Sequence, residues 1–336
     1  MNPVKTINDI ARIAGVSKST VSRALNDNPV ISKKTRKRIQ AIAAEHRFKT
    51  HQAARQLSLN RSQTIALVYP ESEHHRHMVT DPFFMEVLKG ITAAAGDHEY
   101  DLIISQPREN VNRVVNAYIE SKRADGVIYL GCCQNDSLEP IFEKETALIS
   151  CGSDRYENTC SVDCDNIDGG LKAAEHLLGC GCREFAFIGG PKARLETDLR
   201  YQGFAGRLEK LGGRLSPDRI VYGDYLGESG YNHMKLLLKS NPKIDGVFAC
   251  SDLMAMGALE AIRESGKVAG KDISVVGFDD IPFARFSSPP LTTISQNIFK
   301  VGETLVNKLI QFMDDRIISK SILPVELVVR KTTAIK

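Results

Sequence analysis

From Thr64 onward, short apolar runs alternate with longer stretches that have the periodicity of amphipathic helices. Strands that alternate with helices favour parallel sheets built from βαβ units. The predicted strands are 65–69, 102–104, 127–130 and 147–149 in a first set, and 185–188, 220–222, 247–249 and 273–276 in a second. A helix is predicted from Phe84 to His98. Two sets of strands predict two lobes, and ligands of such folds lie at the carboxyl ends of the strands.

The first 45 residues follow a different pattern, that of three short helices. Thr6 with Asp9 three residues later is typical of a capping box, and Gly15 ends the first helix. Ser17 is a good N-cap for a second helix that runs to about Leu25. Ser32 then caps a third helix that runs to about Glu45. Two short helices joined by a turn containing Gly indicate a helix-turn-helix unit.

In a helix-turn-helix unit the second helix enters the major groove of DNA. Lys18, Ser19, Ser22 and Arg23 are the exposed positions of this helix, and basic and hydroxyl side chains can read base edges. Phosphate contacts are predicted for Thr20, Ser32 and Thr35, with Lys33, Lys34 and Arg36 nearby. The other predicted DNA-binding residues here are Thr6, Ser17 and Asn26.

The charge distribution agrees with a polyanion-binding module at the N-terminus. Residues 1–62 contain 13 Lys and Arg against 3 Asp and Glu, a formal charge of +10. The rest of the chain must therefore carry −7 to give the total of +3. No apolar run approaches the roughly 18 residues of a membrane span, and no secretory signal is present, so we expect a cytoplasmic protein without membrane contact.

Two other classes of site have little support in the sequence. The eight cysteines include the pairs Cys160…Cys164 and Cys180-Gly-Cys182, but neither has a standard zinc spacing. We therefore expect reduced, buried thiols and no metal or cofactor. His74–His77 is predicted to be a solvated loop. The G-x-S-x-G, Walker and H-E-x-x-H motifs are absent, which disfavours an enzyme.

The segment Thr6–Asn26, TINDIARIAGVSKSTVSRALN, resembles the LacI/GalR family of bacterial repressors, and the similarity runs through nearly the whole chain. The resemblance implies an all-α helix-turn-helix headpiece at 1–49, and a hinge helix and linker at 50–63. In the hinge, Arg55 is expected on DNA and Leu57 is expected to wedge the central base step in the minor groove. The resemblance further implies a homodimer on a near-palindromic operator.

The remaining residues, 64–336, then form an α/β sensor and dimerisation domain of two lobes, similar to periplasmic binding proteins. Lobe 1 is expected at about 64–164 and 293–321, and lobe 2 at about 165–292 and 322–336. An effector is expected between the lobes, where its binding controls operator affinity. The effector-binding residues implied by the family are Phe83, Phe84, Arg200, Tyr225, Ser251 and Asp279.

An Asp and an Arg that hold adjacent hydroxyls, beside aromatic side chains, favour a carbohydrate effector. A nucleobase and a protein co-regulator remain alternatives, as does a structural ion pair between Arg200 and Asp279. One of Phe83 and Phe84 is expected in the core, and the pattern does not say which. A transport solute-binding protein is the alternative of another class, which the basic headpiece argues against. The sequence does not decide between induction and co-repression.

Overall fold

The computed structural model describes residues 6–25, 27–46, 48, 61–69, 81–107, 111–131, 147–152 and 159–334. The chain divides into two compact units, Met1–Ser62 and Gln63–Lys336. The first is the headpiece and the second is the two-lobed body, and each is described by itself.

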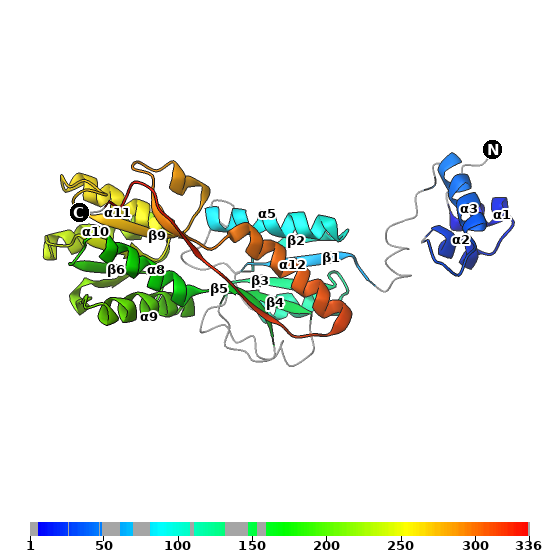
Figure 1. Ribbon diagram of the computed structural model, residues 1–336. Coiled ribbons are helices and arrows are strands. Elements are labelled where there is room, and N and C mark those ends of the chain that lie inside the picture. Colours follow the sequence, from blue (N-terminus) through cyan, green and yellow to red (C-terminus); the bar gives the residue numbers. More distant parts are fainter. Residues whose placement is uncertain are drawn as a thin grey trace. The chain divides into compact units, whose positions relative to one another are not determined.

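The headpiece consists, in its described part, of α1 (Ile7–Ala14), α2 (Lys18–Leu25) and α3 (Lys33–Glu45), as predicted (Figure 1). Thr6 and Asp9 form the expected capping box, and Gly15 ends α1 in the left-handed conformation with φ 63°. Ile10, Val21, Ala24 and Ile39 are fully buried and hold the three helices together. The headpiece therefore has a core of its own.

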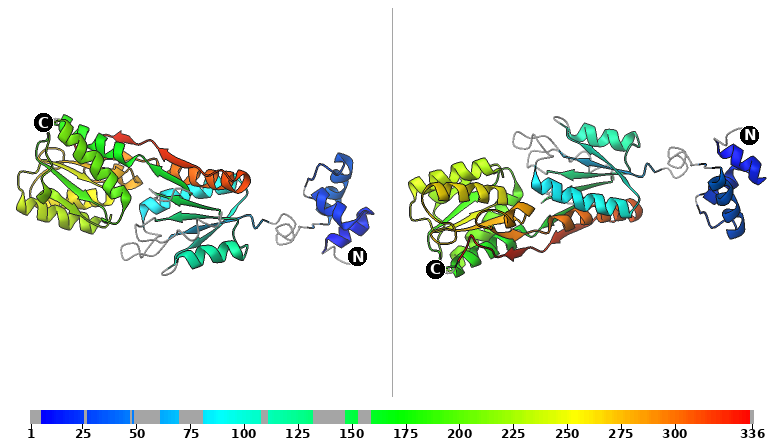
Figure 2. Two further views of the ribbon diagram at one scale, coloured as in Figure 1. Left: turned by 90° about the horizontal axis from the view of Figure 1, so that it is seen from below. Right: turned by 90° about the horizontal axis from the view of Figure 1, so that it is seen from above.

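The first lobe of the body is built on a sheet of six parallel strands in the order β11-β5-β4-β3-β1-β2. Helices α5 (Pro82–Asp97) and α12 (Ile298–Asp315) lie side by side on one face, and α6 (Val111–Glu120) covers the other (Figures 1 and 2). The strands are β1 (Thr64–Val68), β2 (Asp101–Ser105), β3 (Gly126–Leu130), β4 (Leu148–Cys151), β5 (Cys160–Cys164) and β11 (Lys320–Leu323).

The second lobe is built on a six-stranded sheet in the order β12-β10-β9-β8-β6-β7, in which only β12 is antiparallel to its neighbour. Helices α8 (Asn166–Gly179) and α9 (Leu195–Lys210) cover one face, and α10 (Gly227–Ser240) and α11 (Asp252–Glu264) cover the other. The strands are β6 (Phe185–Gly189), β7 (Ile220–Tyr222), β8 (Gly246–Ala249), β9 (Ser274–Asp279), β10 (Thr292–Ser295) and β12 (Glu326–Val328). Short 3₁₀ helices lie at Pro217–Arg219 (η2) and Pro282–Arg285 (η3).

The chain passes between the two sheets at three points. It leaves the first sheet after β5, returns to it after β10, and leaves it again after β11. Figure 1 shows the last passage as the red segment that runs from one sheet to the other. The predicted boundaries near 292 and 321 were a few residues early, because β10 still pairs with β9 and β11 pairs with β5. Strands β5, β10, β11 and β12 were not predicted.

No described helix is long and apolar enough to cross a membrane.

Helices α5 and α12 approach closely because glycine removes a side chain where they cross. A Cβ atom added to Gly90 would overlap the backbone oxygen of Phe299, whereas one added to Gly96 on the same helix would meet nothing within 4 Å. We predict that Gly90→Ala lowers the free energy of unfolding by about 1–3 kcal/mol through overpacking. The matched control Gly96→Ala should raise it by about 0.5–1 kcal/mol, because alanine is the better helix former. Urea unfolding of both variants checks this, and equal effects would refute the close approach.

Candidate functional site

A cavity of about 430 Å³ lies between the two lobes, at the carboxyl ends of strands from both sheets. This volume is within the range of small-molecule sites. The wall contributed by the first lobe and the passages is Tyr69, Asp81, Phe83, Leu130, Gly131, Cys151, Gly152, Asp163, Cys164, Gln296 and Val301. The wall contributed by the second lobe is Arg194, Glu196, Arg200, Tyr225, Leu226, Ser251, Leu253, Asp279 and Ile281.

Arg200, on α9, is a buried cation that the fold holds in one orientation. Its Nε donates to Asn166 Oδ1 at 2.7 Å and its Nη1 donates to the Cys250 carbonyl at 2.6 Å. The guanidinium carbon lies 3.6 Å from the centre of the Phe278 ring, a cation–π contact. Burial alone would lower the pKa of Arg200, but Tyr225, Cys164 and Asp279 raise it above its ordinary value. Arg200 therefore reaches the cavity as a fixed, charged donor.

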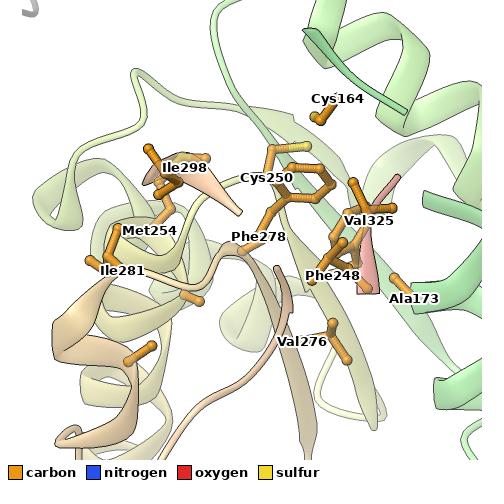
Figure 3. Close-up of a cluster of buried hydrophobic side chains, with 14 of the residues drawn as sticks. Cys164, Ala173, Phe248, Cys250, Met254, Val276, Phe278, Ile281, Ile298 and Val325 are labelled. Carbon is orange, nitrogen blue, oxygen red and sulfur yellow. The ribbon is translucent and has the colours of Figure 1, made fainter. Parts of the chain in front are cut away.

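The Phe278 ring that supports Arg200 belongs to the aromatic core of the second lobe. Phe248 lies 6.4 Å from it between ring centres, and both rings are drawn in Figure 3. This packing fixes the backbone that carries Asp279 into the cavity wall, because Phe278 and Asp279 are consecutive residues of β9.

Asp279 ends β9 with φ 123°, a conformation that residues other than glycine rarely adopt. One carboxyl oxygen accepts a hydrogen bond from Gln296 Nε2 at 2.6 Å. Burial raises the pKa of Asp279 to about 7, although Arg200 and Gln296 act in the opposite direction. Its hydrogen bond is to Gln296, and the described part of the chain contains no ion pair between Asp279 and Arg200. The two groups therefore reach the cavity separately.

The structure separates the two neighbouring phenylalanines. Phe83 lines the cavity, whereas Phe84 is buried in the core with its ring centre 5.0 Å from that of Tyr69. The expectation that Phe84 contacts an effector is thus corrected, because α5 turns Phe84 toward the sheet with Val87 and Ile91.

Tyr225 lines the cavity in a left-handed backbone conformation, with φ 69°. Its hydroxyl is hydrogen-bonded to Thr197 Oγ1 at 2.8 Å, and burial raises its pKa above the ordinary value. A Cβ atom on Gly190 would overlap the tyrosine ring, so glycine there makes room for it. Tyr225 therefore presents a rigid aromatic wall.

Ser251 also lines the cavity, but its hydroxyl group forms hydrogen bonds within the protein. It accepts from the Met254 N–H at 3.1 Å as the N-cap of α11, and donates to the Tyr225 carbonyl at 3.0 Å. Ser251 therefore positions Tyr225 and α11 around the cavity.

Six polar wall residues were not predicted as site residues: Tyr69, Asp81, Asp163, Arg194, Glu196 and Gln296. Tyr69 follows β1 directly and Asp163 lies near the end of β5, so the rule for carboxyl ends of strands could have found both. Asp81 caps α5 by accepting from the Phe83 N–H at 2.9 Å, and accepts from the Tyr69 hydroxyl at 3.3 Å. Gln296 follows β10 directly, but β10 was not predicted as a strand from the sequence. Glu196 gave no signal, because its place depends on how the lobes meet.

In the headpiece, the first turns of α2 are open to solvent. Lys18, Ser19 and Arg23 are exposed and Ser22 is half-buried. Ser17 Oγ accepts from the Thr20 N–H at 3.1 Å, and Ser32 Oγ accepts from the Thr35 N–H at 3.3 Å, so both serines cap helices. Thr6 caps α1 in the same way. Asn26, Arg55, Leu57, the hinge and the His74–His77 segment lie outside the described residues.

No group of three or more His, Cys, Asp or Glu in the described ranges is arranged to hold a metal ion. The six cysteines within those ranges form no disulfide with one another: Cys151, Cys160, Cys164, Cys180, Cys182 and Cys250.

Comparison with known proteins agrees with both units. Residues 6–51 match the family model described as bacterial regulatory proteins, lacI family, and residues 174–333 match a periplasmic binding protein-like domain. The transcriptional regulator CelR of Thermobifida fusca is 31% identical over 96% of this chain and 95% of the relative. The chain belongs to the LacI family of bacterial regulatory proteins. The resemblance inferred from Thr6–Asn26 is thereby confirmed, and this LacI-family chain is a transcriptional regulator with a DNA-binding headpiece and a ligand-binding body.

Other relatives extend the similarity over the whole length. The repressor PurR of Pasteurella multocida (strain Pm70) is 29% identical over 97% of this LacI-family chain and 98% of the relative. A solved complex of the regulator CelR with cellobiose is 28% identical, with a TM-score of 0.75 over 98% of this chain and 100% of that one. The Lac repressor dimer bound to operator and the anti-inducer ONPF is 28% identical, with a TM-score of 0.84 over 99% and 100%.

Proposed function

We propose that this LacI-family chain is a repressor that binds a near-palindromic operator as a homodimer, and that a neutral carbohydrate in the cavity controls its operator affinity. The observation that carries the proposal is the cavity itself, whose wall comes from both lobes and combines aromatic rings with fixed polar groups. A ligand that contacts both lobes can favour one arrangement of them over another.

The headpiece supports the DNA side of the proposal. Lys18, Ser19, Ser22 and Arg23 lie in the first turns of α2, where a recognition helix meets base edges. The basic residues Lys33, Lys34 and Lys37 of α3 are exposed and suited to phosphates. For Arg55 and Leu57 the proposed minor-groove contacts rest on the family resemblance.

The charge of the cavity supports a neutral, hydroxyl-rich ligand. Its wall contains four acidic side chains, Asp81, Asp163, Glu196 and Asp279, against two arginines. Acidic side chains accept hydrogen bonds from sugar hydroxyls and repel phosphate or carboxylate groups. Phe83 and Tyr225 supply aromatic surface. The CelR structure with cellobiose makes cellobiose the first compound to test. A nucleobase could also stack on the rings, and is the second candidate.

A dimer is supported by an apolar groove on the body. It is lined by Pro82, Leu253, Met256, Phe283 and Phe286, with Ser287 at its side. Phe283 is 58% exposed and Phe286 77% exposed, and with their apolar neighbours they form a contiguous patch of the kind that marks an interaction site. We propose a second copy of the chain as the occupant, since solved relatives include Lac repressor dimers. Leu253 lines both this groove and the cavity, so a ligand touches the wall of the dimer contact.

The proposed DNA contacts predict different effects for the substitution of two basic residues. Arg23→Ala should relax base preference at one operator position, at a cost of about 1–3 kcal/mol, because a base-edge contact is lost. Lys34→Ala should weaken binding to all sequences alike and reduce the salt dependence. Operator-variant binding at several salt concentrations checks both. An unchanged base preference in Arg23→Ala would place the recognition helix in another register.

The proposed carbohydrate effector predicts that only some classes of ligand raise the melting temperature. Cellobiose, other neutral saccharides, sugar phosphates, nucleobases and polyols are compared by unfolding of the full chain. A ligand at 100 times its dissociation constant should stabilise the protein by about 2.7 kcal/mol. We expect a neutral saccharide to do so and to change operator affinity. A shift with nucleobases alone would transfer the proposal to the second candidate, and a bound saccharide without effect on DNA affinity would refute the control mechanism.

The dimer reading predicts that charge in the groove weakens self-association. Phe286→Glu places an acid on the proposed contact and should raise the dimer dissociation constant at least about tenfold, because burying an unpaired charge is costly. Leu236→Glu is the matched control, since Leu236 is also exposed (59%) but lies on α10 away from the groove. Sedimentation equilibrium measures both. If Phe286→Glu associates like wild type, the groove is not the contact.

A further inference from the structure

Glu196 differs from the other acidic side chains of the cavity wall. Its Oε2 atom is buried and has no hydrogen-bond partner among the described residues. The other three carboxyl groups are held: Asp81 by the Phe83 N–H and the Tyr69 hydroxyl, Asp163 by the Cys164 N–H and Asn166, and Asp279 by Gln296. A buried polar atom without a partner loses its hydration and gains nothing in return. Such an atom in a ligand cavity needs a functional reason.

The carboxyl group of Glu196 lies where the two lobes meet. Glu196 lies in the first turn of α9, in the second lobe, whereas Gly152 follows β4 of the first lobe. A Cβ atom on Gly152 would lie 2.7 Å from Glu196 Oε1, and Gly152 has φ 104°. The carboxyl group therefore sits directly over the backbone of the opposite lobe, in space that only glycine leaves free. This contact with the first lobe is made through Oε1, and it exists only when the two lobes meet at this point.

We propose that Glu196 makes the approach of the two lobes depend on a ligand that donates a hydrogen bond to its carboxyl group. This inference rests on the proposed effector cavity and names the chemistry that the effector supplies. In the empty protein, approach of the lobes buries Oε2 unpaired and is disfavoured. A ligand hydroxyl supplies the missing donor and removes that cost.

The same group sets a limit on the ligand. A phosphate or carboxylate group is, like the Glu196 carboxylate, a negatively charged hydrogen-bond acceptor. The two groups would therefore repel each other. The ligand at this end of the cavity is therefore a neutral hydroxyl donor. Glu196 acts in this way as a specificity-determining residue, distinct in role from Arg200 and Ser251, whose hydrogen bonds to Asn166, Cys250, Met254 and Tyr225 belong to the fold.

The first test needs no ligand. Glu196→Ala removes the group whose burial disfavours the approach of the lobes, so the ligand-free full chain can bring its lobes together without that cost, and its melting temperature should rise by a few degrees. Glu209→Ala is the matched control, because Glu209 is exposed on the same helix, and its melting temperature should stay within a degree of wild type. A lower melting temperature for Glu196→Ala alone would mean that Glu196 stabilises the fold, and would overturn the proposal.

The second test compares matched ligands by calorimetric titration: cellobiose and methyl β-glucoside against glucuronic acid and glucose 6-phosphate. Glu196→Ala should weaken the tightest neutral saccharide by about tenfold, the order expected for one hydrogen bond, and should not weaken the anionic compounds. Equal affinity of wild type and Glu196→Ala for the neutral saccharide would refute the role of Glu196. If no saccharide binds wild type, the carbohydrate effector is wrong, and the ligand-free melting temperatures still decide the role of Glu196.

Discussion

Parallel strands all end at the same edge of their sheet, and this constraint places about half of the polar groups of the cavity, including Tyr69, Ser251 and Asp279. Tyr69 follows β1, Gly152 follows β4, Ser251 lies two residues after β8, and Asp279 ends β9. Both sheets turn that edge toward the same space, because the chain passes between them three times. Two of these passages carry wall residues, since β5 contains Asp163 and Gln296 follows β10 directly. The site therefore follows from topology before any individual side chain is considered.

Removing the polar wall groups from water costs free energy, and different contacts compensate each group. Arg200 is compensated by two hydrogen bonds and the Phe278 ring. Asp279 is compensated only in part, which its strained backbone and its raised pKa reflect. Burial in the cavity wall favours the protonated form of the Asp279 carboxyl group, because the charged form loses its hydration. Polar groups whose hydrogen bonds are made within the protein fix the shape of the cavity. Polar groups whose loss of hydration is only partly compensated can be stabilised by a ligand.

Short-range sequence patterns were sufficient to predict much of the secondary structure. The headpiece helices could be placed from Thr6, Ser17 and Ser32, because a capping hydroxyl acts within four residues of itself. The buried strands showed as apolar runs, whereas β5, β10, β11 and β12 contain polar or exposed residues that interrupt such a run. The sequence pattern did not decide between Phe83 and Phe84. The structure does, because Phe84, Val87, Ile91 and Ala94 form one buried face of α5.

The positions that could not be predicted all depend on contact between distant parts of the chain. Glu196 stands over Gly152 only because α9 of one lobe meets β4 of the other. Similarly, Leu253 lines the cavity and the apolar groove at once, which no local pattern indicates. The headpiece has its own core, so its fold does not need the body. Under the proposed mechanism, a ligand in the cavity would therefore leave the headpiece folded and act on the proposed groove between two copies, where a change in their pairing would change the spacing of the two headpieces on the operator.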